Sequence, residues 1–238
     1  KYKGRYDEGP EVLRQKRLQR MKEIGLLDAT TLAANLEPLD AWDEMSEEQR
    51  AISIRKMEIY AAMVDSLDQN VGKVLDYLRS SDQLENTIIV FLSDNGAEGI
   101  PLGKLISRSS NSLAPEHKAQ ILGSLKAANI DLEKMGTHES FLTYGGLWAR
   151  AGAAPFRRYK GDVENGGIRA PAFISGPGIK GQRVIDAVLS VRDVMPTTLD
   201  LSDIPYDSTL TTPTLMKDGV NAPTAKSWVS LLNGTETN

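Results

Sequence analysis

The sequence predicts an α/β fold in which helices flank a mostly parallel sheet. A long segment with apolar residues at intervals of three and four predicts a helix, and two short apolar runs, residues 87–92 and 172–175, predict strands. A helix that leads into such a strand is half of a βαβ unit. The chain has 238 residues, of which 40% are hydrophobic, and this length suits one α/β domain or two small ones.

Two helices are expected before the first strand. Residues 11–27 are rich in Arg, Lys, Gln, Leu and Met, and their spacing predicts an exposed amphipathic helix. A second helix is expected to begin after Ser46, because Ser46 and Gln49 have the spacing of a capping box. Its apolar positions recur from Ile54 to Leu78 and predict one buried face, and the polar residues at 80–82 end it.

The strand expected at 87–92 is a continuous apolar run, which is typical of a strand buried on both faces of a parallel sheet. About eighty residues separate it from the strand at 172–175, which is longer than an ordinary loop. Within this insertion, residues 116–132 have partial helical character, and much of it is expected to form the wall of a site. Asp193 is expected to cap a helix that holds Pro196 in its first turn.

The composition excludes several classes of function. The formal net charge is -4 and the basic and acidic residues are interspersed, so no surface for nucleic acid is expected. The chain has no cysteine, hence no disulfide, thiolate zinc site or thiol nucleophile of its own. No apolar run is long enough for a membrane segment. The two histidines, His117 and His138, have no partner at metal-ligand spacing.

Asp94 and Asn95 follow the first predicted strand almost directly, and Gly96 allows a sharp turn after them. In open α/β sheets, ligands bind at the carboxyl ends of the strands. Carboxylate and carboxamide oxygens suit Ca²⁺ or Mg²⁺, and no His or Cys is adjacent to favour zinc. The sequence therefore predicts that these two side chains share one cation, and an ordinary Asp-Asn-Gly turn is the alternative.

A basic segment with several glycines precedes the second predicted strand. The ammonium of Lys160 could meet an anion there, while Gly161, Gly166 and Gly167 would let backbone pass close by. Three arginines are further candidates: Arg157, Arg158 and Arg169. A solvated basic turn is the alternative.

Taken together and in order, these segments resemble the type I sulfatases of the alkaline-phosphatase-like superfamily, most closely the arylsulfatase branch. The resemblance covers nearly the whole chain, including "KYKGRYDEGPEVLRQKRLQRMKEIGLL", "NTIIVFLSDNGAEG", "YGGLWARAGAAPFRRYKG", "GGIRAPAFISGPG" and "LSVRDVMPTTLDL". It implies part of an alkaline-phosphatase-like, mostly parallel sheet with flanking helices. It also implies an enzyme that hydrolyses sulfate esters to an alcohol or phenol plus sulfate.

The resemblance implies roles for three residues. Asp94 and Asn95 match ligands of a single Ca²⁺ ion, with Mg²⁺ less expected, and Lys160 matches a lysine that contacts the sulfate and supports catalysis. The implied substrate is a small-molecule or glycan sulfate ester. The implied compartment is the periplasm or the outside of the cell.

The same resemblance implies that residues 1–238 are one partial sulfatase domain. The family signature Cys-x-Pro-Ser-Arg or Ser-x-Pro-Ser-Arg, whose first residue becomes formylglycine, is not in this sequence. Formylglycine is therefore expected in a missing N-terminal half, and a small C-terminal subdomain is also expected to be missing. The chain alone is expected to be inactive, to expose apolar surface, and to need the N-terminal segment or self-association as a partner.

Two other interpretations stay open. One is a phosphodiesterase or phosphatase of the same superfamily, although two-metal members tend to place His where this chain has Asn95. The other is a non-catalytic chain that retains the fold. The residue before Gly166 is a further departure, because Asn165 stands where the family usually has an acidic residue and Glu164 comes one position earlier.

Overall fold

The computed structural model describes residues 1–34, 42–101, 114–128, 130–179, 181, 183–205 and 225–235. The chain divides into two compact units. The first unit comprises Lys1–Ser81 and Asn95–Ala172, and the second comprises Asp82–Asp94 and Phe173–Asn238. Each unit is described by itself.

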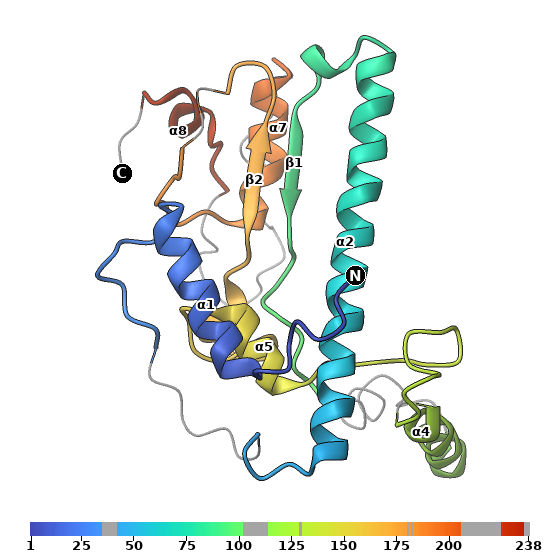
Figure 1. The fold of residues 1–238 in the computed structure, drawn as a ribbon. Helices are drawn as coiled ribbons and strands as arrows, with labels where there is room; N and C mark the ends of the chain where they lie inside the picture. Colours follow the sequence, from blue (N-terminus) through green and yellow to red (C-terminus); the bar gives the residue numbers. More distant parts are fainter. Residues whose placement is uncertain are drawn as a thin grey trace. The chain divides into compact units, whose positions relative to one another are not determined.

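The core of the first unit lies where helix α1 (Pro10–Glu23) packs against helix α5 (Gly146–Ala153) (Figure 1). Pro10 stands in the first turn of α1, where its missing N–H costs little. The predicted helix over 11–27 is confirmed in its position, but it ends at Glu23 and leaves Ile24 and Leu26 exposed. The buried side of α1 includes Leu18.

Trp148 of α5 is completely buried and holds this core together. Its indole Nε1 donates to both the backbone oxygen and the hydroxyl of Ser53, at 3.1 and 2.9 Å. The rings of Tyr6 and Trp42 meet Trp148 edge-on, with centroid separations of 5.9 and 5.7 Å. A single side chain therefore joins segments that are far apart in the sequence.

Helix α2 (Glu47–Ser80) is the longest helix in the described part of the chain. Its predicted start is confirmed, because the Gln49 N–H donates to the Ser46 hydroxyl at 3.2 Å and the Ser46 N–H donates back to Gln49 Oε1 at 2.9 Å. This capping box satisfies two N–H groups that would otherwise lack partners at the helix start. The helix ends at Ser80, as the polar residues there predict.

The predicted burial of one face along the whole of α2 is wrong for its C-terminal half. Met57, in the N-terminal half, is buried. Beyond it, three large apolar side chains of the predicted face are exposed: Val64, Leu67 and Val74. Three other residues of the same face, Val71, Leu75 and Leu78, are half-buried. The second half of the predicted apolar face is therefore covered only in part.

The second unit is built around strands β1 (Ile89–Leu92) and β2 (Ala172–Ser175), which form a two-stranded sheet. Both strands lie where the apolar runs predict them. The predicted burial on two faces is wrong, because β1 is half-buried and β2 is mostly exposed. A run of apolar residues predicts a strand without showing whether both of its faces are covered.

The two strands run antiparallel, so the predicted parallel arrangement is wrong for this pair. The Phe91 and Phe173 rings are stacked with centroids 5.0 Å apart. Gly176, just after the end of β2, lies against Ile88, just before the start of β1. Figure 1 shows the two arrows pointing in opposite directions. The apolar pattern of a strand does not encode the direction of its neighbour.

Helix α7 (Val194–Leu201) follows a short 3₁₀ helix, Val191–Asp193, and helix α8 (Val229–Asn233) lies nearer the C-terminus. As predicted, Pro196 stands in the first turn of α7, where it is buried. The other elements within the described residues are a 3₁₀ turn, Leu84–Asn86, and helices α4, Pro115–Ala128, and α6, Asn165–Ile168.

The Asp193 side chain does not cap α7, in contrast to the prediction. Its buried carboxylate accepts hydrogen bonds from the Ser190 N–H at 2.9 Å, the Lys226 N–H at 2.9 Å and the Trp228 indole at 3.2 Å. The Thr197 hydroxyl also accepts from the Trp228 N–H at 2.9 Å. Asp193 therefore fastens the segment before α8 to the start of α7, which is a tertiary role that local spacing cannot show.

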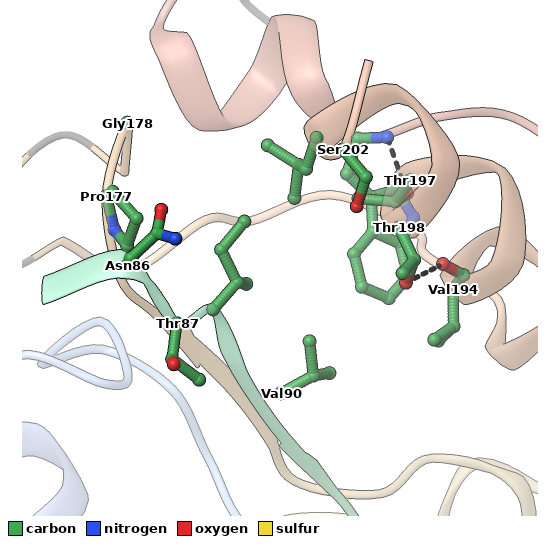
Figure 2. A pocket seen from close by; sticks show the side chains of 12 residues that line it. Asn86, Thr87, Val90, Pro177, Gly178, Val194, Thr197, Thr198 and Ser202 are labelled. Carbon is green, nitrogen blue, oxygen red and sulfur yellow. Dashed lines mark hydrogen bonds between the residues drawn. The ribbon is translucent and has the colours of Figure 1, made fainter. Parts of the chain in front are cut away.

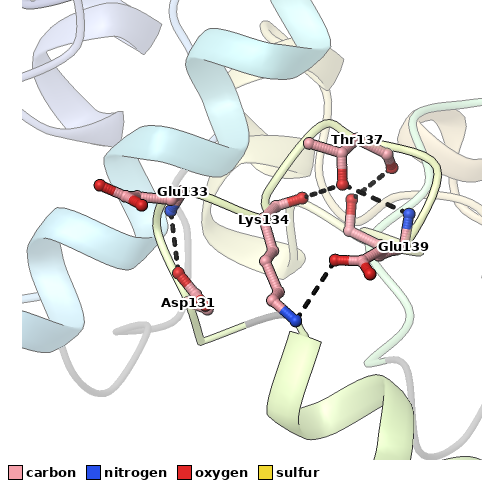
Figure 3. Close-up of polar contacts among 6 residues, drawn as sticks. Asp131, Glu133, Lys134, Thr137 and Glu139 are labelled. Carbon is pink, nitrogen blue, oxygen red and sulfur yellow. Dashed lines mark hydrogen bonds and ion pairs between the residues drawn. The ribbon is translucent and has the colours of Figure 1, made fainter.

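Local polar contacts hold the turn after α4 (Figure 3). Lys134 Nζ lies 3.3 Å from Glu139 Oε2, and the Glu133 N–H donates to Asp131 Oδ1 at 3.0 Å. His138 in this turn is exposed. Within the residues placed by the structure, no helix has the length and apolar character needed to cross a membrane.

Candidate active site

Asp94 and Asn95 stand just beyond the end of β1, as the sequence predicts. Asp94 is exposed and Asn95 is half-buried. Among the described residues, no three His, Cys, Asp or Glu side chains are grouped so that they could hold a metal ion. Because Ca²⁺ takes roughly six to eight oxygen ligands, these two side chains supply only part of such a site. The convergence of their oxygens on one cation stays a prediction.

Backbone hydrogen bonds bring the segment that holds Lys160 to the loop after Asn95. The Gly96 N–H donates to the Gly167 oxygen at 2.9 Å, and the Lys160 N–H donates to the Ala97 oxygen at 2.9 Å. All four of these residues belong to the first unit. Lys160 is thus fixed beside the loop that begins at the candidate metal ligands, and its approach to Asp94 stays a prediction.

Glycines make this close approach of two backbones possible. A Cβ on Gly96 would lie 1.9 Å from the Gly166 oxygen, and a Cβ on Gly166 would lie 2.1 Å from the Arg157 oxygen. A Cβ on Gly167 would meet the Asp162 oxygen at 2.1 Å. No side chain fits at these distances, so the expectation that glycines let backbone pass close by is confirmed for Gly166 and Gly167. It is not confirmed for Gly161, where a Cβ would make only an ordinary contact of 3.9 Å with the Ile100 side chain. We call the paired segments 96–97 and 157–167 the glycine clamp.

The Lys160 ammonium forms an ion pair with Glu98, with Nζ 3.2 Å from Oε2. The other carboxylate oxygen, Oε1, accepts a hydrogen bond from the Ile100 N–H at 2.7 Å. The two side chains are 42% and 29% exposed, so water can reach the pair. Glu98 is not among the residues that the sequence identified, because nothing in the local pattern connects it with a lysine so distant in the sequence.

The three candidate arginines have other partners. Arg157 Nε lies 3.4 Å from Glu164 Oε2, and Arg158 Nε lies 3.9 Å from the other oxygen of the same carboxylate. The Arg169 guanidinium lies over the Phe156 ring, 5.0 Å from its centroid. Glu164 therefore neutralises the positive charge of Arg157 and Arg158. Lys160 is the candidate cation that pairs with the loop following Asn95.

Tyr144 adds a neutral hydroxyl to this region of the first unit. Burial raises its pKa well above the usual range, and the neighbouring Tyr60 and Glu98 act in the same direction, whereas Arg17 opposes them. The Tyr144 and Tyr60 rings are stacked, with centroids 4.5 Å apart. Tyr144 therefore stays protonated at neutral pH and can donate a hydrogen bond.

Two cavities in the described part of the chain lie away from these residues. One of about 680 Å³ lies inside the second unit, at the start of β1 and thus at the opposite end of the strand from Asp94 (Figure 2). It is lined mainly by Asn86, Thr87, Val90, Pro177, Thr197 and Ser202. Another, of about 560 Å³ in the first unit, is lined by α2 residues that include Lys56, whose pKa is lowered by burial. Neither is lined by a residue that the sequence identified for chemistry.

The sequence of this chain is similar to sequences of known sulfatases along most of its length. The sulfatase family model matches residues 1–204. An uncharacterized sulfatase of Schizosaccharomyces pombe is 41% identical over 209 residues, which are 87% of this chain and 36% of that protein. An arylsulfatase of Klebsiella aerogenes is 32% identical over 224 residues, 93% of this chain and 46% of the relative.

A more distant relative is arylsulfatase K of Gallus gallus, 24% identical over 180 residues, which are 74% of this chain and 24% of that protein. The chain thus spans less than half the length of these relatives. The match to the family model covers most of the chain and agrees with the resemblance drawn from its motifs. The chain belongs to the sulfatase family.

Proposed function

We propose that the protein containing this chain hydrolyses sulfate esters to an alcohol or phenol plus sulfate. The chain would supply part of the sulfate site and part of a calcium site. The observation that carries the proposal is the glycine clamp, which fixes Lys160 beside the loop after Asn95 in a member of the sulfatase family. Relatives described as arylsulfatases support an aryl sulfate as the first substrate to try.

Asp94 and Asn95 would be ligands of one Ca²⁺ ion. Their hard oxygens at the end of β1 are of the type that calcium prefers, and Mg²⁺ is a less suitable occupant for a site shared among distant segments. The bound ion would neutralise negative charge on the sulfate oxygens. Asp94 would contribute the formal negative charge, and Asn95 would contribute a neutral oxygen.

Lys160 would hold the transferring sulfate by charge. An ammonium fixed at the point where charge develops typically contributes on the order of 10²-fold in rate. The nucleophile, a formylglycine in the family that the motifs resemble, would come from residues outside this sequence, which has no cysteine. The natural substrate would be a small-molecule or glycan sulfate ester, met in the periplasm or outside the cell.

Turnover of aryl sulfate and aryl phosphate by the full-length protein tests the proposal. We expect the sulfate ester to be preferred, and Lys160→Ala to lower kcat/KM for it about 100-fold. Lys134→Ala is the matched control, because Lys134 belongs to an exposed ion pair of similar length, 3.3 Å, in the turn after α4. Preference for the phosphate ester would instead support a phosphatase, and turnover of neither would support a non-catalytic chain.

Calcium titration provides a second readout. Asp94→Ala in the full-length protein should weaken calcium binding and leave the secondary structure unchanged, because Asp94 is exposed beyond the strand end. Asp82→Ala, at the end of α2, is a control that removes one exposed carboxylate elsewhere. Equal calcium affinity in the Asp94→Ala variant and the parent protein would contradict the role of Asp94.

A further inference from the structure

We infer that Glu98 is a positioning residue for Lys160, whose carboxylate holds the ammonium in place and competes with the bound sulfate for it. The inference rests on the proposed function. It concerns a residue outside the three to which the sequence assigned roles. It is carried by the ion pair of 3.2 Å between the two side chains, together with the hydrogen bond that orients the carboxylate.

The Glu98 carboxylate is itself held in one orientation. Oε1 accepts from the Ile100 N–H at 2.7 Å, which turns Oε2 toward the Lys160 ammonium. The Lys160 backbone is fixed independently by its hydrogen bond to Ala97, next to Glu98 in the sequence. Both ends of the Lys160 side chain are therefore anchored to the same short loop.

This anchoring matters because a lysine side chain is flexible. Four methylene groups joined by rotatable bonds separate the Lys160 ammonium from the backbone, and the side chain is 42% exposed. Among the residues that the structure describes, Glu98 is the carboxylate paired with this ammonium. Without the Glu98 carboxylate, the Lys160 side chain would sample many rotamers, and its ammonium would no longer be held in one position.

The same carboxylate opposes the binding of an anion. A sulfate ester that contacts the ammonium brings negative charge close to Glu98, and like charges at such distances repel. Glu98 therefore has two opposing effects. It weakens the binding of sulfate in the ground state, and it keeps the Lys160 ammonium in the position that the reaction needs. These two effects act on different kinetic constants, which makes them separable.

Glu98→Gln separates them in the full-length protein. The glutamine removes the charge, and its single amide oxygen can replace either the carboxylate oxygen at Ile100 or the one at Lys160, while an NH2 group, which donates, takes the other position. We expect the KM for an aryl sulfate and the inhibition constant of inorganic sulfate to fall about three- to tenfold, and kcat to fall by a similar factor. Glu98→Asp keeps the charge but is one carbon shorter, so we expect it to lower kcat without lowering KM.

Glu139→Gln is the control, because Glu139 pairs with Lys134 at 3.3 Å, close to the 3.2 Å of the Glu98 pair, although its side chain is more exposed, at 49% against 29%. It should change none of these constants. If Glu98→Gln also leaves kcat, KM and the inhibition constant within twofold of the parent, the role of Glu98 is refuted. The proposed function then still stands if Lys160→Ala loses activity.

A binding measurement decides the inference without turnover. Calorimetric titration of the full-length protein with inorganic sulfate should give a dissociation constant that is about three- to tenfold lower for Glu98→Gln than for the parent. Unchanged or weaker sulfate binding in that variant would overturn the inference. If the parent does not hydrolyse sulfate esters, the proposed function fails, and this titration still tests whether Glu98 competes with an anion for Lys160.

Discussion

The two halves of helix α2 share one apolar periodicity and differ in what surrounds them. In the N-terminal half, Met57 is buried and Ser53 accepts the indole hydrogen bond of Trp148. In the C-terminal half, Val74 and Tyr77 are 59% and 68% exposed. Periodicity therefore specifies which face of a helix is apolar, whereas burial depends on whether another segment reaches that face.

The buried half is covered by residues that are distant in the sequence. Trp148 is 95 positions from Ser53, and its burial depends on α5 packing against α1. In the other half, residues such as Val74 remain largely exposed. The energetic consequence is that substitutions of similar type should have very different effects in the two halves.

The largest difference is expected for Trp148→Ala. Removing this fully buried ring should lower the free energy of unfolding by about 3 to 5 kcal/mol, because it leaves a cavity beside α2 and Ser53 loses its indole partner. Val74→Ala in the exposed half should cost no more than about 0.5 kcal/mol. Urea denaturation of both variants measures the difference. Similar losses would show that the C-terminal half is also covered in solution.

An intermediate effect is expected at the start of α2. Ser46→Ala removes the side-chain oxygen of the capping box and should cost about 1 kcal/mol in the free energy of unfolding. The same substitution at Ser66, which is exposed in the body of α2, should be neutral or slightly stabilising because alanine favours the helix. Thermal denaturation distinguishes the two, and equal effects would mean that the cap is not formed in solution.

The smallest effect is a gain in the exposed half. Apart from the neighbouring residues and the backbone of the same helix, a Cβ on Gly72 would have no atom within 4 Å, so Gly72→Ala should stabilise the protein by about 0.5 to 1 kcal/mol. The gain should appear as a higher midpoint in urea denaturation. Destabilisation would indicate that another surface packs closely on α2 at this position.

Much of the fold follows from local sequence patterns. The capping box at Ser46 and the second strand, Ala172–Ser175, lie where the sequence predicts them, because each depends on neighbouring residues. The direction of the strand pair and the role of Asp193 were predicted wrongly. Both depend on which distant segment lies alongside, and a local pattern carries no information about that partner.

In the candidate site, too, local sequence predicts some features, whereas others depend on contacts between distant segments. The residue types and their position after a strand identified Asp94 and Asn95, whereas Lys160 was singled out within the basic segment only by the family resemblance. The structure adds the backbone hydrogen bonds that bring Lys160 to the loop after Asn95. Glu98 could not be found from spacing, because its ion pair joins residues that are 62 positions apart, 160 minus 98.

The glycine clamp also affects how natural variants of this chain should be interpreted. Gly-to-Ala is normally ranked among the mildest replacements, yet at Gly96 and Gly166 even a methyl group would overlap a backbone oxygen. In a deep mutational scan, these positions should therefore reject small and large residues alike. A missense change there would act as a displacement of Lys160 relative to the loop after Asn95, although neither glycine has a side chain to take part in chemistry.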